Sequence, residues 1–514
     1  MRGSVRVQVL PPIQPGKEIA TLHVLFIVKE IDNEPQGILL ISSVLKQAGH
    51  QVSLVVATEE DPVEAALRLR PDVLGYTVYT GPHTWYLELN RRIRAQLPGV
   101  FSIFGGPHPT FFPELIEREG VDGLCIGEGE YATLDLVSAL ERDGQGSTGP
   151  GVRLTNTAIP NWWFKVNGEI VRNPLRPLLT GEELDALPFA DRELLYAAHE
   201  QSRRTKIKPF ITGRGCPYDC AFCFNKAYSD LYGGHGRRFR RRSPDNVIRE
   251  LKAVASQHDV RFVLFMDDTF ILQDKWLNEF MARYKAEITR DGAPVPFWCQ
   301  VRANLVTDEK IALFRDAGCV SVSFGIEAGN DRLRNVILNR NMSREEILGA
   351  AEILRKHGIA FMTNNMLGLP TGNLETDFET LELNAQCRPA YANVFLFQPY
   401  PKTALGEWAY QHGWMRGTFD DLSGSVSDDT VINFGSEAEK RQIENLQKLF
   451  ALGVEFPRLL PAIRRLIRLP SNRLFWLIYK LWKGWAIKNR MFPFKMTPAE
   501  YLDSALYYMR IKSQ

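Results

Sequence analysis

The stretch ITGRGCPYDCAFCFNK, residues 211–226, decides how the rest of this chain is interpreted. It places Cys216, Cys220 and Cys223 on one short loop, directly after an apolar, strand-like run and a Gly-Arg-Gly turn. Thiolates this close in sequence can bind a single iron–sulfur cluster, and such clusters usually take four cysteines. Three local ligands therefore predict a cluster with one iron left open for another molecule.

Two simpler interpretations compete with the cluster. A structural zinc site takes four ligands, commonly as two closely spaced pairs, and no second Cys/His pair lies near this loop in sequence. A disulfide is the other alternative, but disulfides are typical of secreted proteins, and we find no secretory signal pattern here. The remaining cysteines stand in apolar contexts and are expected to pack in the core. They are Cys125, Cys299, Cys319 and Cys387.

The composition is that of an ordinary globular protein. A chain of 514 residues predicts two or three domains, and 45% hydrophobic with 24% charged residues is usual for such proteins. The net charge of +2 argues against a nucleic-acid partner. No apolar run is long enough to span a membrane. The seven cysteines, in a chain without a secretory signal pattern, predict a reducing, cytoplasmic location.

Short apolar runs alternate with helical patterns after an N-terminal arm of residues 1–20. We expect residues 21–142 to form one domain because buried short strands separated by amphipathic helices predict a doubly wound parallel sheet. Ligands of such sheets bind beyond the carboxyl ends of the strands. The expected strands are 22–28, 52–56, 73–78, 100–104 and 123–126, and the expected helices are 37–48, 62–69, 84–97, 112–119 and 131–141.

The alternation resumes after a connector, residues 143–205. The connector is expected to contain a hairpin around Asn167-Gly168 and a segment, residues 187–192, without function. Residues 206–400 then contain six strand–helix units, and residues 401–514 are expected to be mainly helical. The expected strands are 208–212, 261–266, 296–301, 320–326, 360–367 and 392–397. Helices are expected over 244–257, 275–288, 308–317, 343–357 and 374–387, several of them with caps at Ser243, Thr307 and Ser343.

The cysteine spacing is the cluster motif of the radical S-adenosylmethionine (SAM) enzymes, and the chain resembles that superfamily. Glycine turns after the third, fourth and fifth strands, together with Pro35-Gln36-Gly37, resemble the cobalamin-binding domain attached to many of these enzymes. The resemblance covers residues 22–400. It implies an α/β fold with a Rossmann-like cobalamin domain and a partial (β/α)6 barrel. The implied cofactors are a 4Fe–4S cluster, SAM and cobalamin; the alternative is a degenerate first domain that holds no cobalamin.

The resemblance also implies which residues meet the cofactors. The three cysteines of the loop would bind three irons. Contacts to SAM are expected at strand ends, from Phe222, Asp267, Asp268, Arg302, Glu327 and Gly368. The alternatives are that the aspartate pair caps a helix and that Arg302 is an ordinary surface arginine.

Cobalamin contacts are expected from the turns of the first domain. The Asp-x-His-x-x-Gly motif, which supplies a histidine to cobalt in other cobalamin proteins, is absent, so we expect no histidine ligand. The expected contacts are Gln36, Thr77, Tyr79, Thr80, Gly105, Gly106, Pro107, His108, Gly127, Glu128, Gly129 and Glu130.

The activity implied is methylation of an unactivated carbon of a small molecule, lipid-like or a secondary metabolite, after one-electron cleavage of SAM. Radical cyclisation or rearrangement is the first alternative, because enzymes of similar architecture share the same motifs. The second alternative is a non-catalytic iron–sulfur or corrinoid-binding protein. A monomer served by an external low-potential electron donor is expected, and no protein nucleophile or general base is identifiable.

Two basic stretches remain. The run of residues 237–242 is interpreted as a solvated face, with guidance of an anionic substrate as the alternative. Residues 461–469 and 473–487 are expected to be basic helices with a wide apolar face. They would form a helical cap over the barrel or, alternatively, contact a membrane surface.

Overall fold

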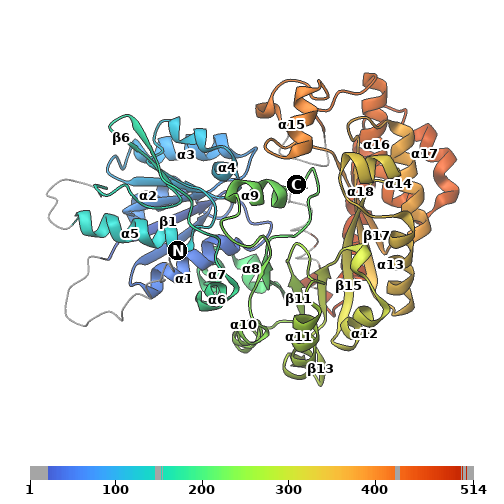
Figure 1. Ribbon diagram of the computed structural model, residues 1–514, viewed down its shortest axis with the longest axis horizontal. Coiled ribbons are helices and arrows are strands. Elements are labelled where there is room, and N and C mark those ends of the chain that lie inside the picture. The colour runs from blue at the N-terminus through green and yellow to red at the C-terminus, as the bar shows by residue number, and fades with distance from the viewer. Residues whose placement is uncertain are drawn as a thin grey trace, which may run out of the picture.

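The computed structural model describes residues 21–144, 152, 154–422, 429–498, 500, 501 and 505. Two α/β units lie beside one another, the first in blue and the second in yellow and orange in Figure 1. The expected α/β fold with a Rossmann-like first domain and a partial barrel is confirmed. The N-terminal arm lies outside the described residues.

Five parallel strands form the centre of the first sheet, in the order β2-β1-β3-β4-β5. Successive residues of these strands enter opposite apolar clusters: Val24 and Phe26 pack under α1 and α5, whereas Leu25 and Ile27 pack under α2 and α3. Burial on both faces explains the continuous apolar runs. The strands are β1 (His23–Val28), β2 (Gln51–Val56), β3 (Val73–Thr77), β4 (Phe101–Gly105) and β5 (Gly123–Cys125).

The helices of this domain follow the expected pattern except at one place. The single helix expected over 112–119 is instead a short helix, α4, followed by a 3-10 turn, η1. Pro113 causes the break because the residue before a proline avoids the helical region, and Phe112 has φ −126° and ψ 66°. The helices are α1 (Gln36–Gln47), α2 (Pro62–Leu69), α3 (His83–Arg94), α4 (Pro107–Phe111), η1 (Pro113–Glu117) and α5 (Glu130–Gly144).

Part of the expected connector extends the first sheet. Strands β6 (Trp162–Val166) and β7 (Glu169–Arg172) form the expected hairpin, and β6 pairs antiparallel with β5. Asn167 and Gly168 both have positive φ, as a two-residue turn of this kind requires. Trp162 is buried and its Nε1 donates to the carbonyl of Ala132 at 2.7 Å.

The second sheet has six parallel strands in the order β17-β16-β15-β14-β11-β8. Each strand is added next to the one before it along the chain, so the sheet continues in one direction as a partial barrel. The strands are β8 (Ile207–Phe210), β11 (Phe262–Phe265), β14 (Phe297–Gln300), β15 (Cys319–Glu327), β16 (Ala360–Leu367) and β17 (Tyr391–Leu396).

Helices cover the outside of this sheet, and their expected caps are confirmed. The side chains of Ser243, Thr307 and Ser343 each accept a hydrogen bond from the backbone N–H three residues further on. The helices are α10 (Pro244–Gln257), α11 (Asp274–Glu287), α12 (Asp308–Asp316), α13 (Arg344–Lys356) and α14 (Leu374–Cys387).

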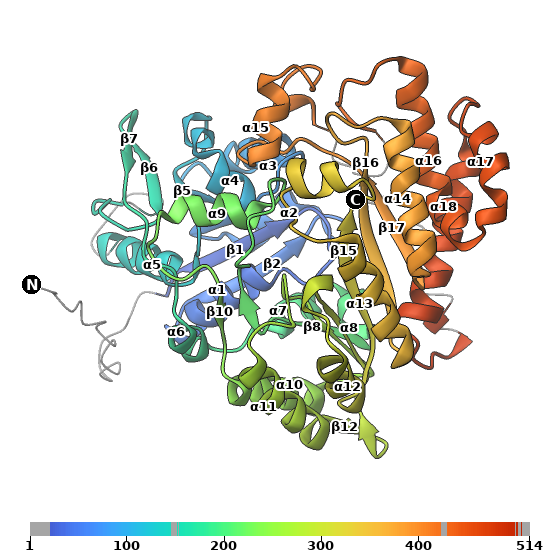
Figure 2. The ribbon, with the colours of Figure 1, turned by 45° about the vertical axis from the view of Figure 1, so that its right-hand side comes forward.

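The cysteine loop leaves the carboxyl end of β8 and faces the first domain. It runs from β9 (Gly213–Arg214) into α9 (Phe224–Tyr232), and β9 pairs with β10 (Arg240–Arg241). Figures 1 and 2 both place α9 against α4 of the first domain, where the rings of Phe111 and Phe224 are 4.9 Å apart. The loop therefore lies between the two units.

The interpretation of residues 237–242 as a solvated face is wrong for the second half of the run. Arg240 and Arg241 are buried. The Arg241 guanidinium lies over the ring of Trp276 and donates to the backbone oxygens of Phe270 and Leu272. Burial lowers the pKa of Arg241 to about 10. Arg241 thus joins β10 to the loop after β11, and Arg240 donates to Glu128 and to the carbonyl of Leu179.

The C-terminal region is helical, as expected, and its helices α16, α17 and α18 lie at the right-hand side of Figure 2. Helix α16 packs against α14, β17 and α18, with Leu446 and Phe450 in the core between them. No helix in the described part of the chain is long and apolar enough to cross a membrane. The elements are α15 (Ala404–Gln411), η4 (Phe419–Asp421), α16 (Glu437–Glu455), η5 (Pro457–Leu459), α17 (Leu460–Leu466), α18 (Arg473–Ala486) and η6 (Ile487–Met491).

The remaining elements are short. They are α6 (Gly181–Ala186), α7 (Arg192–Ala198), α8 (Glu200–Arg204), β12 (Thr289–Arg290), β13 (Ala293–Pro294), η2 (Ala303–Leu305) and η3 (Leu333–Ile337).

Candidate functional site

The cysteine loop has a tightly defined backbone. Gly215 has φ +80°, and a Cβ there would lie 2.0 Å from the carbonyl oxygen of Arg238, so only glycine fits before Cys216. The Cys223 N–H donates to the Cys220 carbonyl at 3.1 Å. Cys220 is buried, whereas Cys216 and Cys223 are half-buried.

Cationic and polar groups surround the three thiols. Nη1 of Arg340 lies 3.4 Å from Sγ of Cys220, and Nη1 of Arg302 lies 3.8 Å from the same sulfur. The Nε atoms of both arginines are buried and make no hydrogen bond with the described residues. Burial raises the pKa of the Cys223 thiol to about 11. Two guanidinium groups beside the most buried sulfur offset the negative charge that thiolate ligands would bring, so the donor set fits an iron–sulfur cluster.

The simpler interpretations of the cysteines find less support. All seven cysteines are free thiols, so the disulfide alternative is wrong. Among the described residues, no three His, Cys, Asp or Glu side chains converge as ligands of a single metal ion. A zinc–thiolate bond of about 2.3 Å would require such convergence, whereas a cluster distributes its thiolates over separate irons.

The aspartate pair after β11 divides into two environments. Asp267 is buried and accepts hydrogen bonds from the N–H and the hydroxyl of Thr212, at 3.1 and 2.7 Å. Asp268 is exposed and lies near Cys223. Desolvation by the surrounding groups raises its pKa, opposed by the Asn225 amide and the Gly215 N–H. Of the two, only Asp268 has a carboxylate available to a ligand.

Glu327 ends β15 in an unusual conformation. Its φ is +66°, which is rare for a residue other than glycine and recurs at ligand sites. A Cβ on Gly325 would lie 1.9 Å from Oε1 of Glu327, so that glycine makes room for the carboxylate. Burial raises the pKa of Glu327, opposed by Arg340, 3.9 Å away, and by Arg302.

Arg302 is not the ordinary surface arginine of the alternative interpretation. Its side chain is buried, lies over the ring of Tyr218 at 3.9 Å and donates to the carbonyl of Arg340. Tyr218 lies within the cysteine loop, so Arg302 connects the end of β14 to that loop. The expected contact of Arg302 with SAM stays a prediction.

The other two residues expected to meet SAM lie at the same end of the sheet. Phe222 is partly buried beside Ala328 and Leu369. Gly368 has φ +71°, its N–H donates to Asp377, and a Cβ would lie 2.8 Å from the ring of Phe434. The glycine is thus explained by its own packing, and a contact with adenine is not needed to account for it.

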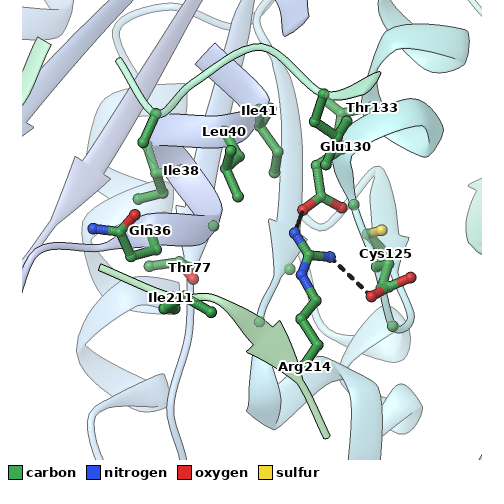
Figure 3. A pocket seen from close by; sticks show the side chains of 18 of the residues that line it. Gln36, Ile38, Leu40, Ile41, Thr77, Cys125, Glu130, Thr133, Ile211 and Arg214 are labelled. Carbon is green, nitrogen blue, oxygen red and sulfur yellow. Dashed lines mark hydrogen bonds and ion pairs between the residues drawn. The ribbon is translucent and has the colours of Figure 1, made fainter. Parts of the chain in front are cut away.

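A cavity of about 420 Å³ lies between the first domain and the base of the cysteine loop (Figure 3). Its walls come from the turns after β3, β4 and β5, from α1 and from β9. Gly37 and Gly105 leave free space at the wall of the cavity. A Cβ on either residue would have no heavy atom of the protein closer than 3.7 Å. The expected cobalamin residues that line it are Gln36, Thr77, Gly105, Gly106, Gly127, Glu128, Gly129 and Glu130.

The other four expected contacts lie outside that lining. Tyr79 is 57% exposed. His108 is buried between the rings of His83 and Phe112, and its Nδ1 lies 3.0 Å from the hydroxyl of Thr80. Burial, together with His83, lowers the pKa of His108 to about 3. The structure therefore uses His108 in packing, and Pro107 is likewise absent from the cavity wall.

Two glutamates of the turn after β5 form ion pairs across the domain boundary. Arg214 donates to Glu130 Oε1 at 2.5 Å and to Glu128 Oε1 at 2.8 Å (Figure 3). Arg240 also donates to Glu128 Oε1, at 2.7 Å. Burial alone would raise the pKa of Glu128, but Arg214 and Arg240 outweigh it and lower the pKa. Both carboxylates are thus engaged with the second domain.

The cavity fits the planar ring of a corrinoid in its chemistry. Backbone of glycine-rich turns forms one wall, Ile38 and Leu40 add apolar surface, and no histidine lines the cavity. Glycines allow the close approach that a flat ligand needs. The connector also contributes, because Leu187, Pro188, Phe189 and Ala190 line the cavity. The expectation that residues 187–192 have no function stays a prediction, although four of these residues line the cavity.

Sequence reasoning missed several residues of the site. Arg340 is buried in a loop after η3, and no local sequence pattern distinguishes it from arginines that are exposed. Arg214 stands two positions before Cys216, so its place beside the motif was an available signal. Asn225 follows the motif, and its Nδ2 lies 3.8 Å from Sγ of Cys223.

Two family models match the chain. Residues 210–383 match the radical SAM superfamily, and residues 22–137 match the B12 binding domain. The first range covers the cysteine loop and strands β11 to β16 of the second sheet, and the second range covers strands β1 to β5 of the first sheet.

Several curated proteins are similar over much of the chain. An uncharacterized methyltransferase of Pyrococcus horikoshii is 27% identical over 73% of this chain and 78% of its own length. The anaerobic magnesium-protoporphyrin IX monomethyl ester cyclase of Rubrivivax gelatinosus is 28% identical over 72% of this chain and 65% of its own. The hopanoid C-3 methylase of Methylococcus capsulatus is 24% identical over 72% of this chain and 67% of its own.

A solved structure shares the fold over nearly the whole chain. The cobalamin-dependent S-adenosylmethionine radical enzyme OxsB, with aqua-cobalamin and S-adenosylmethionine bound, superposes with a TM-score of 0.65 at 15% identity. The match covers 96% of this chain and 75% of that one.

Proposed function

We propose that this chain, which belongs to the radical SAM superfamily and carries a B12-binding domain, methylates an unactivated carbon of a small molecule. One observation carries the proposal: the cavity of the first domain adjoins the cysteine loop of the second, so that residues on either side of the cysteines line it. When bound, a 4Fe–4S cluster with SAM supplies hydrogen abstraction and methylcobalamin supplies the methyl group.

The chain's own residues bind SAM and the cluster and orient them. Asp268 and Glu327 are the carboxylates placed to receive the ammonium group of SAM, because Asp267 is occupied by Thr212. Arg302 and Arg340 place positive charge beside Cys220 and are available to a carboxylate. Cys216, Cys220 and Cys223 hold the cluster.

Aromatic side chains cover the loop and would exclude water. Phe224, next to Cys223, contacts Phe111 of α4 at 4.9 Å and Tyr400, beyond β17, at 5.6 Å between ring centroids. These three rings come from both domains and bridge them above the cysteines. We infer that the substrate is apolar where it meets them, because the bridge offers it mainly ring surface.

Oxidative cyclisation is the second candidate. It is favoured by the cyclase of Rubrivivax gelatinosus, which is 28% identical to this chain. The methyltransferase of Pyrococcus horikoshii is 27% identical. Methylation is preferred because the chain spans 78% of the methyltransferase but 65% of the cyclase.

The test measures the fate of SAM. Anaerobically reconstituted protein with hydroxocobalamin, SAM and a low-potential reductant should form both 5′-deoxyadenosine and S-adenosylhomocysteine when an apolar substrate is supplied. Cys220→Ala should lose the 5′-deoxyadenosine. Cys387→Ala, which removes a buried thiol at the end of α14, is the matched control and should keep it. 5′-Deoxyadenosine without S-adenosylhomocysteine would favour cyclisation, and neither product would favour the binding-protein alternative.

We also propose that the enzyme acts as a monomer, receives electrons from an external donor and meets its substrate at a membrane surface through a basic, apolar face. Between Glu455 and Glu500 the sequence has ten Lys or Arg residues and no Asp or Glu. The exposed arginines in this stretch are Arg458, Arg465, Arg468 and Arg473.

Helix α18 has two apolar faces. Phe475, Tyr479 and Ala486 are buried in the molecule. Large apolar side chains also repeat at helical spacing on the face exposed to solvent. These are Leu474, Leu477, Leu481 and Trp485, from 40% to 61% exposed. An apolar stripe beside cationic side chains is typical of helices that lie on anionic bilayers, where each Lys or Arg contributes about 1 kcal/mol.

Vesicle flotation tests this face. The protein should float with vesicles containing phosphatidylglycerol and not with phosphatidylcholine alone, and the triple change Leu474→Glu, Leu477→Glu and Leu481→Glu should abolish flotation. Val336→Glu, at an apolar residue 71% exposed on η3, is the control and should float as before. Flotation that survives the triple change would contradict the proposal, and concentration-dependent dimers lost in that variant would make the face a protein interface.

A further inference from the structure

One turn of the first domain, residues 127–130, holds both ends of the cysteine loop. Upstream of the cysteines, Arg214 donates to Glu130 at 2.5 Å and to Glu128 at 2.8 Å. Downstream, the N–H of Glu128 donates to the hydroxyl of Tyr232, the last residue of α9, at 3.2 Å. A Cβ on Gly127 would lie 2.0 Å from that hydroxyl, so turn and tyrosine fit only because Gly127 is there.

The same groups line the cavity. Glu128, Glu130 and Arg214 are all part of its wall (Figure 3). Asn225, which also lines it, places Nδ2 3.8 Å from Sγ of Cys223. A molecule in the cavity therefore contacts the residues that hold the loop and a residue that touches one of its thiols.

The ion pairs leave little freedom for the loop to move independently. Side-chain exposure is 5% for Glu130, 11% for Glu128 and 22% for Arg214. Glu128 is also held by the N–H of Leu179, at 2.9 Å, and by Arg240. Separating any one pair would leave a buried charge without its partner, which is strongly unfavourable. The turn and the loop therefore shift together.

We propose that this clamp, made by Glu128, Glu130, Arg214 and Tyr232, couples occupancy of the cavity to the accessibility of the three cluster cysteines. The inference rests on the proposed function, because the occupant is a corrinoid. A ring seated against residues 127–130 fixes the two glutamates, and these hold Arg214 and the start of the loop. Because coupling between sites is reciprocal, a loop held by its cluster in turn favours the corrinoid-bound state.

The experiment follows thiol alkylation in cluster-free, full-length protein. Iodoacetamide is added with and without saturating hydroxocobalamin, and the rate at each cysteine is read by peptide mass spectrometry. Cys216, Cys220 and Cys223 should react at least about fivefold more slowly with the corrinoid bound, the lower end of usual coupling between sites. The buried Cys299, Cys319 and Cys387 report global unfolding and should stay unreactive in both states.

Variants separate coupling from simple shielding. Arg214 lines the cavity, so Arg214→Gln is compared at hydroxocobalamin concentrations that saturate the variant, as read by absorbance after gel filtration. At saturation the protection of the three cysteines should disappear. Tyr232→Phe removes the hydroxyl that accepts from the Glu128 N–H and from the Tyr228 hydroxyl, the latter at 3.3 Å. It should reduce the protection, so it serves if Arg214→Gln does not fold. Arg238→Gln is the matched control: Arg238 pairs with Asp219 inside the loop, at 2.6 Å, and does not reach the first domain. It should change absolute rates and keep the protection.

Each outcome decides between the two proposals. Protection that persists in Arg214→Gln with bound corrinoid means direct shielding and overturns the coupling. Binding without protection in the unaltered protein also overturns the coupling and leaves the proposed function standing. Absence of corrinoid binding to the unaltered protein overturns both.

Discussion

Asp267 and Asp268 are neighbours in sequence with different partners in the structure. Asp267 accepts two hydrogen bonds from Thr212 in a buried position, whereas Asp268 presents its carboxylate near Cys223. Asp267→Asn should lower the free energy of unfolding by about 1–3 kcal/mol, because it disrupts buried hydrogen bonds to a charged acceptor. Thermal unfolding of the cluster-free protein measures this change.

Asp268→Asn should show the opposite pattern. Stability should stay within about 0.5 kcal/mol, as for most exposed positions. Binding of SAM to the reconstituted protein should weaken about tenfold or more, because a hydrogen bond to a charged group is lost. Equilibrium binding measures the affinity; a large loss of stability with unchanged affinity would mean that Asp268 is structural.

Individual site residues could be predicted from the sequence where they belong to a short local motif. The three cysteines and Glu327 beside its glycines were recognisable, and the structure places them at the same end of one sheet. Arg340 was not, because its approach to Cys220 depends on a loop that returns over the strand ends. The separate environments of Asp267 and Asp268 were also beyond the sequence, since they depend on Thr212, which lies between β8 and β9.

At the scale of elements, strands and helices followed their periodicity closely. Helix α10, helix α14 and strand β16 have the expected bounds. Pairing was harder to foresee. The hairpin of β6 and β7 was expected, but its addition to the edge of the first sheet depends on Trp162 fitting against Ala132. Likewise, a run of arginines gives no sign that Arg241 will meet Trp276.

Helix α16 carries a carboxyl group whose titration should affect stability. Burial, and then a hydrogen bond with Asp429, raise the pKa of Glu444 from 4.5 to about 7, opposed by Lys440. A raised pKa in the folded state favours folding below pH 4.5, and this contribution is lost as the pH rises through about 7. Glu444→Gln should therefore stabilise the protein at pH 8 by about 1–3 kcal/mol relative to the unaltered chain.

Denaturant unfolding between pH 4.5 and 8 measures this effect. The variant should show a flatter dependence of stability on pH across that window. Glu437→Gln is the control in the same helix, because Arg416 lowers the pKa of Glu437 and its titration falls below the window. An unchanged slope in Glu444→Gln would show that the group titrates normally.

At the scale of the whole molecule, one buried arginine joins the connector to both domains. Arg192 donates to Glu34, which precedes α1, and to the carbonyl of Pro209 in β8. It also lies 3.6 Å from Glu250 of α10. Arg192→Ala should cost about 3–5 kcal/mol, because it removes the ion-pair partner of the buried Glu34, whereas Glu250 keeps Arg242 at 2.6 Å.

Arg192→Ala should also change the number of transitions seen in calorimetric unfolding. Each domain has its own core. Loss of the Arg192 contacts between the domains should therefore divide one calorimetric transition into two. Arg172→Ala, at an exposed arginine over the ring of Trp163, should preserve a single transition. A single transition in Arg192→Ala, merely shifted to lower temperature, would mean that other contacts suffice to unite the domains.

The turn of residues 127–130 has a consequence for the order of synthesis. It lies in a sheet that is complete once residue 172 has been made, before any cysteine of the loop has left the ribosome. Because domains generally fold as units, N-terminal first, the newly made Arg214 meets a finished surface. The first domain thus acts as a template on which the cysteine loop takes its shape, before the rest of the barrel exists to support it.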